Sequence, residues 1–103
     1  MIDVSSAQLA LVKKILSEHV PGLTVWAFGS RVQGKVKKYS DLDLVLITDK
    51  PLPLTKMTAI QDAFSESDLP WRVDVVDWSR LDKSFQKVIS DGYEVLGMNA
   101  AAN

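Results

Sequence analysis

Two aspartates, Asp41 and Asp43, are separated by one residue at the start of an apolar segment, residues 42–48. Because side chains alternate along a strand, both carboxylates are expected on one face, with their backbones about 6.6 Å apart. Such a pair can hold one divalent cation or two, and in two-metal phosphoryl chemistry the ions lie about 3.5–4 Å apart. Oxygen donors without a nearby His or Cys favour Mg²⁺ or Mn²⁺ over zinc. The pair therefore predicts a magnesium site, with manganese as the alternative ion.

A third carboxylate, Asp74, lies in the middle of another apolar segment. An acid in such a segment is costly unless it is paired or binds a metal. If its strand lies beside that of Asp41 and Asp43, three carboxylates share one face, and their mutual repulsion favours a bound cation. Taken alone, Asp74 could instead pair with Arg72 or Arg80. The sequence leaves both interpretations open.

Gly29 and Ser30 end an earlier apolar segment and open a turn. Glycine lets the backbone approach a ligand closely, and serine offers a hydroxyl and an N–H to a phosphate oxygen. The following residues 31–40 contain no acid and four basic residues, Arg31, Lys35, Lys37 and Lys38. Beside an acidic metal site, this combination favours a nucleoside triphosphate as ligand. Arg31 is the preferred phosphate contact because it adjoins the turn.

Hydrophobic spacing predicts the elements that position these residues. Apolar residues three and four apart predict helices, and runs of β-branched and aromatic residues predict strands. The expected helices are residues 7–20, 55–65 and 81–90, with Ser5 or Ser6 capping the first and Thr55 the second, and the expected strands are residues 23–28, 42–48 and 71–78. Residues 93–96 are expected to form a short strand or an extended tail. This alternation predicts an α/β fold, a sheet with helices packed on it.

The composition limits the remaining possibilities. The 103 residues predict one domain, 1–103, with a core of about residues 4–96 and a frayed tail at 97–103. The chain has no Cys, which excludes a disulfide scaffold, a cysteine nucleophile and a thiolate zinc site, and which fits a cytoplasmic location. No apolar run approaches the roughly 20 residues of a membrane helix. A net charge of −1 argues against nucleic-acid binding through a broadly basic surface.

The segment FGSRVQGKVKKYSDLDLVLI, with its Gly-Ser, ten residues and Asp-x-Asp, resembles the signature of the polymerase-beta-type nucleotidyltransferases. The chain is similar in length to the minimal nucleotidyltransferases, and the resemblance covers residues 4–96. It implies a small mixed β-sheet with helices packed on it. It also implies that Gly29 and Ser30 contact the triphosphate and that Asp41 and Asp43 hold Mg²⁺, with two ions in the site.

The resemblance also implies a third metal-binding and catalytic acid on a later strand. Asp74 is the matching position, and it would complete the metal site and help activate the acceptor hydroxyl. Asp77 lies in the same strand, but by alternation it faces the other side and is the weaker candidate.

The closest resemblance is to the nucleotide-binding subunit of two-protein systems in which a helical HEPN protein is the other half. It implies an antitoxin that transfers AMP from ATP to a tyrosine of the HEPN toxin. Because little of the chain lies outside the resembling core, a partner chain or a second copy is expected to supply the surface for base and acceptor. Two alternatives remain: a non-catalytic subunit that masks its toxin, and an enzyme that modifies a small molecule or an RNA end.

Overall fold

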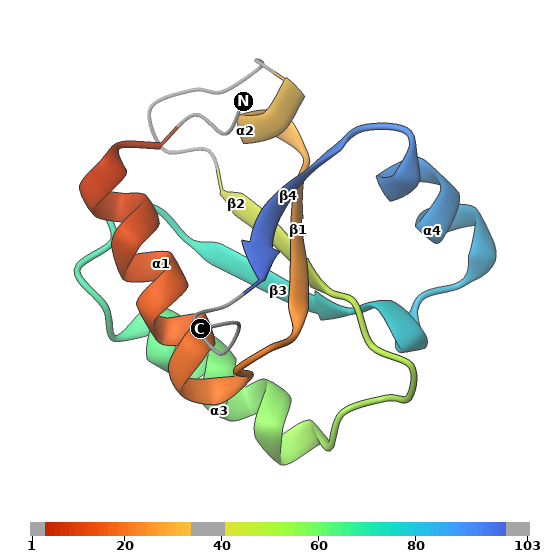
Figure 1. Cartoon of the computed structure of the whole chain (residues 1–103), viewed down its shortest axis with the longest axis horizontal. Coiled ribbons are helices and arrows are strands. Elements are labelled where there is room, and N and C mark those ends of the chain that lie inside the picture. The colour runs from red at the N-terminus through yellow and green to blue at the C-terminus, as the bar shows by residue number, and fades with distance from the viewer. Residues whose placement is uncertain (1–3, 34–40, 99–103) are drawn as a thin grey trace.

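The computed structural model describes residues 4–33 and 41–98 (Figure 1). Helices and strands follow in the order α1 (Ser6–His19), β1 (Thr24–Phe28), α2 (Ser30–Gln33), β2 (Leu42–Leu46), α3 (Leu54–Ser65), β3 (Val73–Asp77), the 3₁₀ turn η1 (Trp78–Arg80), α4 (Lys83–Ser90) and β4 (Tyr93–Met98). The predicted α/β class is confirmed. Within residues 4–33 and 41–98, no helix is both long enough and apolar enough to cross a membrane.

The four strands form one mixed sheet in the order β3-β2-β1-β4. Strand β1 runs antiparallel to both β2 and β4, whereas β2 and β3 are parallel. The nearly continuous apolar sequence of β2 predicts a strand covered on both faces, and β2 is indeed an interior strand of the sheet. The segment that carries Asp43 is therefore fixed by strands on both sides.

Helices α1 and α3 pack side by side on one face of the sheet (Figure 1). Alternation along β2 turns Leu42, Leu44 and Leu46 toward them, and all three leucines are fully buried. They join Val12 of α1 and Ile60 of α3 in the main hydrophobic core. This alternation places Asp43 and Val45 on the opposite face.

Aromatic side chains and α4 cover part of that opposite face. Trp26 stacks on Tyr93 with ring centroids 3.9 Å apart, and the ring of Trp78 meets Trp26 edge-on at 5.4 Å. Phe28 of β1 meets Phe85 of α4 edge-on at 6.0 Å. This aromatic layer encloses one side of the row of strand residues that contains Asp43.

A side chain of α3 satisfies the outer edge of β3. Gln61 donates from Nε2 to the carbonyl oxygen of Val73, and its Oε1 accepts from the N–H of Val75 at 3.1 Å. An unpaired strand edge can recruit another chain, so these bonds both anchor α3 and protect β3. They hold in place the strand that carries Asp74.

The start of α3 and the end of β4 differ from the sequence prediction. Helix α3 begins at Leu54 after Pro53, whose carbonyl accepts from the N–H groups of Lys56 and Met57, so Thr55 lies inside the helix and is not its cap. Strand β4 runs on to Met98, which pairs with Thr24, whereas the expected strand ended at residue 96. The prediction was wrong there because pairing with β1 supplies order that local composition does not reveal.

The predicted cap of the first helix is confirmed, whereas the predicted turn after Gly29 is corrected. Ser5, one of the two serines considered, caps α1, and its Oγ accepts from the N–H of Gln8 at 3.1 Å. The sequence predicted only a turn after Gly29, where the structure has the short helix α2. Lys35, Lys37, Lys38 and residues 99–103 lie outside the described residues.

Candidate active site

Strand register brings Asp43 and Asp74 side by side. In the parallel pair β2–β3, Asp43 is the register partner of Asp74, and in the antiparallel pair β1–β2 it is the partner of Phe28. Neighbouring strands lie about 4.8 Å apart, and partners in register share a face. The predicted adjacency of Asp74 and Asp43 is confirmed. Asp41 lies one residue before β2 and is exposed.

The turn after β1 lies directly against the Asp43 carboxylate. Gly29 has a φ of +83°, a conformation that glycine adopts without strain, and a Cβ added there would clash with Asp43 Oδ2. The carbonyl of Gly29 accepts from the N–H of Val32 at 3.1 Å, which closes the first turn of α2. The backbone conformation therefore favours glycine here, and a Cβ would in addition force the Asp43 carboxylate to move. This turn places the backbone that leads into Ser30 next to Asp43.

Asp43 is the electrostatically perturbed group of this site. Its pKa rises from the ordinary value of 3.8 to about 6, first because burial disfavours the charged carboxylate and then because of repulsion from Asp74 and Asp41. Asp74 and Asp41 therefore both act on Asp43 through their charges. A bound cation would relieve both penalties.

One oxygen of Asp74 is already engaged. Arg72 Nε lies 2.8 Å from Asp74 Oδ1, so the ion pair considered from the sequence is present. Among residues 4–33 and 41–98, no three Asp, Glu, His or Cys side chains meet closely enough to chelate one ion. That Asp41, Asp43 and Asp74 together bind a metal therefore stays a prediction.

The Arg31 side chain is buried and does not extend into solvent. It is 5% exposed, and its guanidinium carbon lies 4.5 Å from the centroid of the Trp71 ring, a cation–π arrangement. Trp71 itself is buried in the main core. The contact ties the first turn of α2 to the segment that leads into β3.

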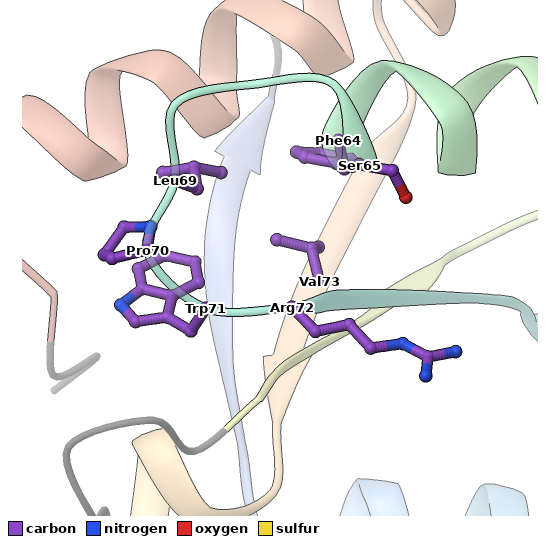
Figure 2. A pocket seen from close by; sticks show the side chains of 7 residues that line it. All are labelled: Phe64, Ser65, Leu69, Pro70, Trp71, Arg72 and Val73. Atoms are coloured by element: carbon purple, nitrogen blue, oxygen red, sulfur yellow. The ribbon is translucent and has the colours of Figure 1, made fainter.

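A separate pocket of about 300 Å³ lies between the end of α3 and the start of β3 (Figure 2). Its lining residues are Phe64, Ser65, Leu69, Pro70, Trp71, Arg72 and Val73. The lining includes Arg72 but neither Asp43 nor Asp74. The acidic site is therefore not this pocket but the row of residues on the α4 side of the sheet.

The motif and the fold are matched by a known family. A family model described as "Polymerase beta, Nucleotidyltransferase" matches residues 11–100, most of the chain. The chain belongs to the polymerase beta nucleotidyltransferase family. The described geometry agrees with the resemblance seen in the sequence, and the mixed sheet implied by that resemblance is confirmed.

Similar proteins narrow the comparison. This nucleotidyltransferase is 53% identical over 95 residues to the "Probable protein adenylyltransferase MntA" of Haemophilus influenzae, covering 92% of this chain and 83% of that protein. Its fold matches a crystal structure of a toxin–antitoxin with AMP-PNP at a TM-score of 0.75 and 21% identity, covering 91% of this chain and 76% of that one. It also matches a chain in a structure described as a tri-AMPylated Shewanella oneidensis HEPN toxin in complex with MNT antitoxin, at a TM-score of 0.67 and 19% identity, covering 89% of this chain and 71% of that chain.

Membership in the nucleotidyltransferase family implies dependence on a divalent cation. The donor set fits this requirement, because Asp43 and Asp74 supply the carboxylate oxygens that hard cations prefer. The raised pKa of Asp43 supports the same conclusion, since burial and neighbouring charges penalise this carboxylate as long as no cation is bound.

Asp77, the weaker catalytic candidate, serves the fold. It is 2% exposed; its Oδ1 accepts from Thr48 Oγ1 and from the N–H of Ser79 at 3.1 Å, and its Oδ2 accepts from the N–H of Leu52 at 2.7 Å. Arg80 Nε lies 3.7 Å from the same Oδ2. The carboxylate therefore closes the end of β3 onto the segment that follows β2, and strand alternation separates it from Asp74.

Sequence reasoning underrated one residue of the site and missed one contact. Arg72 entered only as a reason to discount Asp74, although residues two apart along an extended segment share a face. The cation–π contact between Arg31 and Trp71 joins positions 40 residues apart. No local signal in the sequence predicts such a contact.

Proposed function

We propose that this nucleotidyltransferase transfers AMP from ATP to a hydroxyl of a HEPN partner protein and thereby acts as an antitoxin. The relative at 53% identity is named a probable protein adenylyltransferase. The matched structures include a toxin–antitoxin with AMP-PNP and an AMPylated HEPN toxin with its MNT antitoxin. The observation that carries the proposal is the row formed by the Gly29 turn, Asp43 and Asp74.

In the proposed site, Asp41, Asp43 and Asp74 hold the divalent cations, for which Mg²⁺ is the expected ion and two the expected number. Asp43 is the central ligand because it lies between the Gly29 turn and Asp74. When bound, the cations would neutralise charge on the phosphates and lower the pKa of the acceptor hydroxyl.

The triphosphate is assigned to the turn at Gly29 and Ser30. The absence of a side chain at Gly29 lets phosphate oxygens approach both the backbone and Asp43. Arg31, packed on Trp71, anchors this turn to the segment before β3 and adds positive charge close to the phosphates. Its burial favours this supporting role over a flexible contact from solvent.

The reaction is an in-line displacement at the α-phosphorus. The acceptor oxygen forms a bond to the α-phosphorus while the bond to the bridging oxygen of the β-phosphate breaks. The hydroxyl proton passes to an Asp74 carboxylate oxygen, and pyrophosphate leaves with the bridging oxygen and its electron pair. Asp74 suits this role because it is half-buried and adjoins Asp43.

Transfer of label tests the proposal directly. The protein is incubated with α-³²P-ATP, Mg²⁺ and the product of the neighbouring gene, and label on that protein is measured after electrophoresis. We expect strong labelling by the wild type and a loss of at least about 100-fold for Asp43→Asn, because the central carboxylate ligand of the proposed cations is removed. Asp62→Asn is the matched control, because it makes the same carboxylate-to-amide change at an exposed position on α3. It should label the partner as strongly as the wild type does.

Two outcomes contradict the proposal: no label from the wild type, or full label from Asp43→Asn. If the doubly substituted Asp41→Asn, Asp43→Asn protein still protects cells from the toxin, masking and not transfer is the antitoxin mechanism. Label that appears only on a small molecule or an RNA end would assign the enzyme to that acceptor.

Because the reaction consumes ATP, we place the protein in the cytoplasm. The surface that binds the acceptor is assigned to the partner chain or to a second copy of this chain.

A further inference from the structure

Arg72 makes a directed contact that contributes little to the stability of the fold. Its Nε lies 2.8 Å from Asp74 Oδ1, while its side chain is 71% exposed and that of Asp74 is 35% exposed. Exposed ion pairs contribute about 0–1 kcal/mol to stability. Figure 2 shows the Arg72 side chain at the start of β3, extending away from the side chains of Leu69 and Pro70 that line the same pocket.

The placement of Arg72 follows from strand alternation. Residues 72 and 74 are two apart, so both side chains leave the same face, and Asp43 is the register partner of Asp74 on that face. Lys87 of α4 and Asp91, which follows the helix, form the comparable exposed pair, with Nζ 3.7 Å from Oδ1. The Arg72–Asp74 contact is shorter, and it involves the acid that the proposed reaction uses.

We propose that Arg72 is a positioning residue for the nucleotidyl transfer. Its Nε binds Oδ1 of Asp74 and thereby directs Oδ2 toward the cation and the acceptor hydroxyl beside Asp43. This inference rests on the proposed function. Hydrogen bonds from surrounding residues fix metal-binding side chains in this way, and their loss typically costs about 10- to 100-fold in metal affinity or activity.

A purely electrostatic role makes the opposite prediction. Removing a positive charge beside an acidic site should tighten cation binding if charge alone matters, because Arg72 and the cation would then compete for Asp74. If Arg72 instead fixes the orientation of Asp74, its removal should weaken binding. The sign of the change therefore separates positioning from competition.

The test compares wild type, Arg72→Gln and Arg72→Lys, with Lys87→Gln as the matched control for the loss of an exposed paired charge. Mn²⁺ affinity is measured by electron paramagnetic resonance of the free ion, without nucleotide or partner. The KM for ATP, kcat and the melting temperature are measured in parallel. We expect Arg72→Gln to bind Mn²⁺ about 10- to 100-fold more weakly and to lose kcat by a similar factor, with its KM for ATP within about twofold of wild type.

The remaining variants complete the test. Arg72→Lys should recover part of the lost affinity, since it keeps the charge but not the planar Nε donor. The control Lys87→Gln should match the wild type, and all four melting temperatures should agree. Mn²⁺ binding by Arg72→Gln that is equal to or tighter than that of the wild type overturns the inference. If the wild type transfers no nucleotide, the proposed function fails, whereas the Mn²⁺ affinities still decide the role of Arg72.

Discussion

At the scale of single residues, Asp43 combines three influences that disfavour its charge. It is half-buried, and Asp74 and Asp41 are both close enough to repel it. Such an arrangement lowers the stability of the folded protein, and proteins keep destabilising arrangements of this kind mainly at functional sites. Asp77, three residues after Asp74, shows the contrast, because its carboxylate is saturated by hydrogen-bond donors of the fold.

The pKa of Asp43 predicts a specific pH dependence of stability in metal-free protein. Because the folded pKa of about 6 lies above the ordinary value of 3.8, the folded state retains a proton that the unfolded chain releases between these values. The free energy of unfolding should therefore fall as pH rises from about 4 to 6. The free energy of unfolding of Asp43→Asn should not fall over this pH range. At pH 7 it should exceed that of the wild type by about 1 kcal/mol, after allowance for solvent screening.

Urea unfolding at several pH values with a chelator present measures this difference. Asp62→Asn, on the far face of the sheet, should follow the wild-type curve. An Asp43→Asn protein that is less stable than the wild type at pH 7 would show that the carboxylate is not penalised. Added Mg²⁺ should reduce the difference in stability between Asp43→Asn and the wild type, because it stabilises only the folded wild type.

At this scale the sequence predicts much of the site. The Asp-x-Asp spacing and the alternation of residues identify Asp43 and Asp74 as neighbours once their strands pair. The sequence does not predict which partner Asp74 takes, because Arg72, Arg80 and a cation all satisfy a carboxylate. The 2.8 Å contact between Arg72 Nε and Asp74 Oδ1 in the structure identifies Arg72 as the partner.

At the scale of elements, the turn between β1 and α2 couples two parts of the site. Gly29 adopts a positive φ and lies against Asp43 Oδ2, so the turn and the carboxylate fix each other. The sequence predicts a glycine turn at this position. It does not predict the close approach, because that depends on the antiparallel pairing of Phe28 with Asp43.

Gly29 is constrained both by its positive φ and by its closeness to Asp43 Oδ2, and substitutions can separate these two constraints. Gly29→Ala should lower stability by about 1–3 kcal/mol, since it combines backbone strain at positive φ with a clash against Asp43. Gly22→Ala, at the other end of β1 with a φ of +80°, should show the backbone strain alone. We expect Gly29→Ala, and not Gly22→Ala, to lose Mn²⁺ affinity as well. Equal losses of stability and unchanged Mn²⁺ binding in both variants would contradict the account.

At the scale of the whole molecule, the sheet order decides which predictions succeed. The interior position of β2 follows from its apolar sequence, and the covering helices follow from their periodicity. The pairing of β4 with β1 does not, because residues 93–98 carry only a weak strand pattern and gain order from a partner far away in sequence. Long-range pairing also sets the register that aligns Asp43 with Asp74.

The central claim is that Asp43 and Asp74 hold the divalent cation opposite the turn at Gly29 and Ser30. The most direct test is a crystal structure with Mn²⁺ and α,β-methylene-ATP, which cannot be cleaved at the reacting bond, with manganese located by anomalous scattering. We expect manganese bound to carboxylate oxygens of Asp43 and Asp74, with the triphosphate against the glycine turn. Manganese bound without either carboxylate, or a triphosphate seated away from Gly29, would contradict the account.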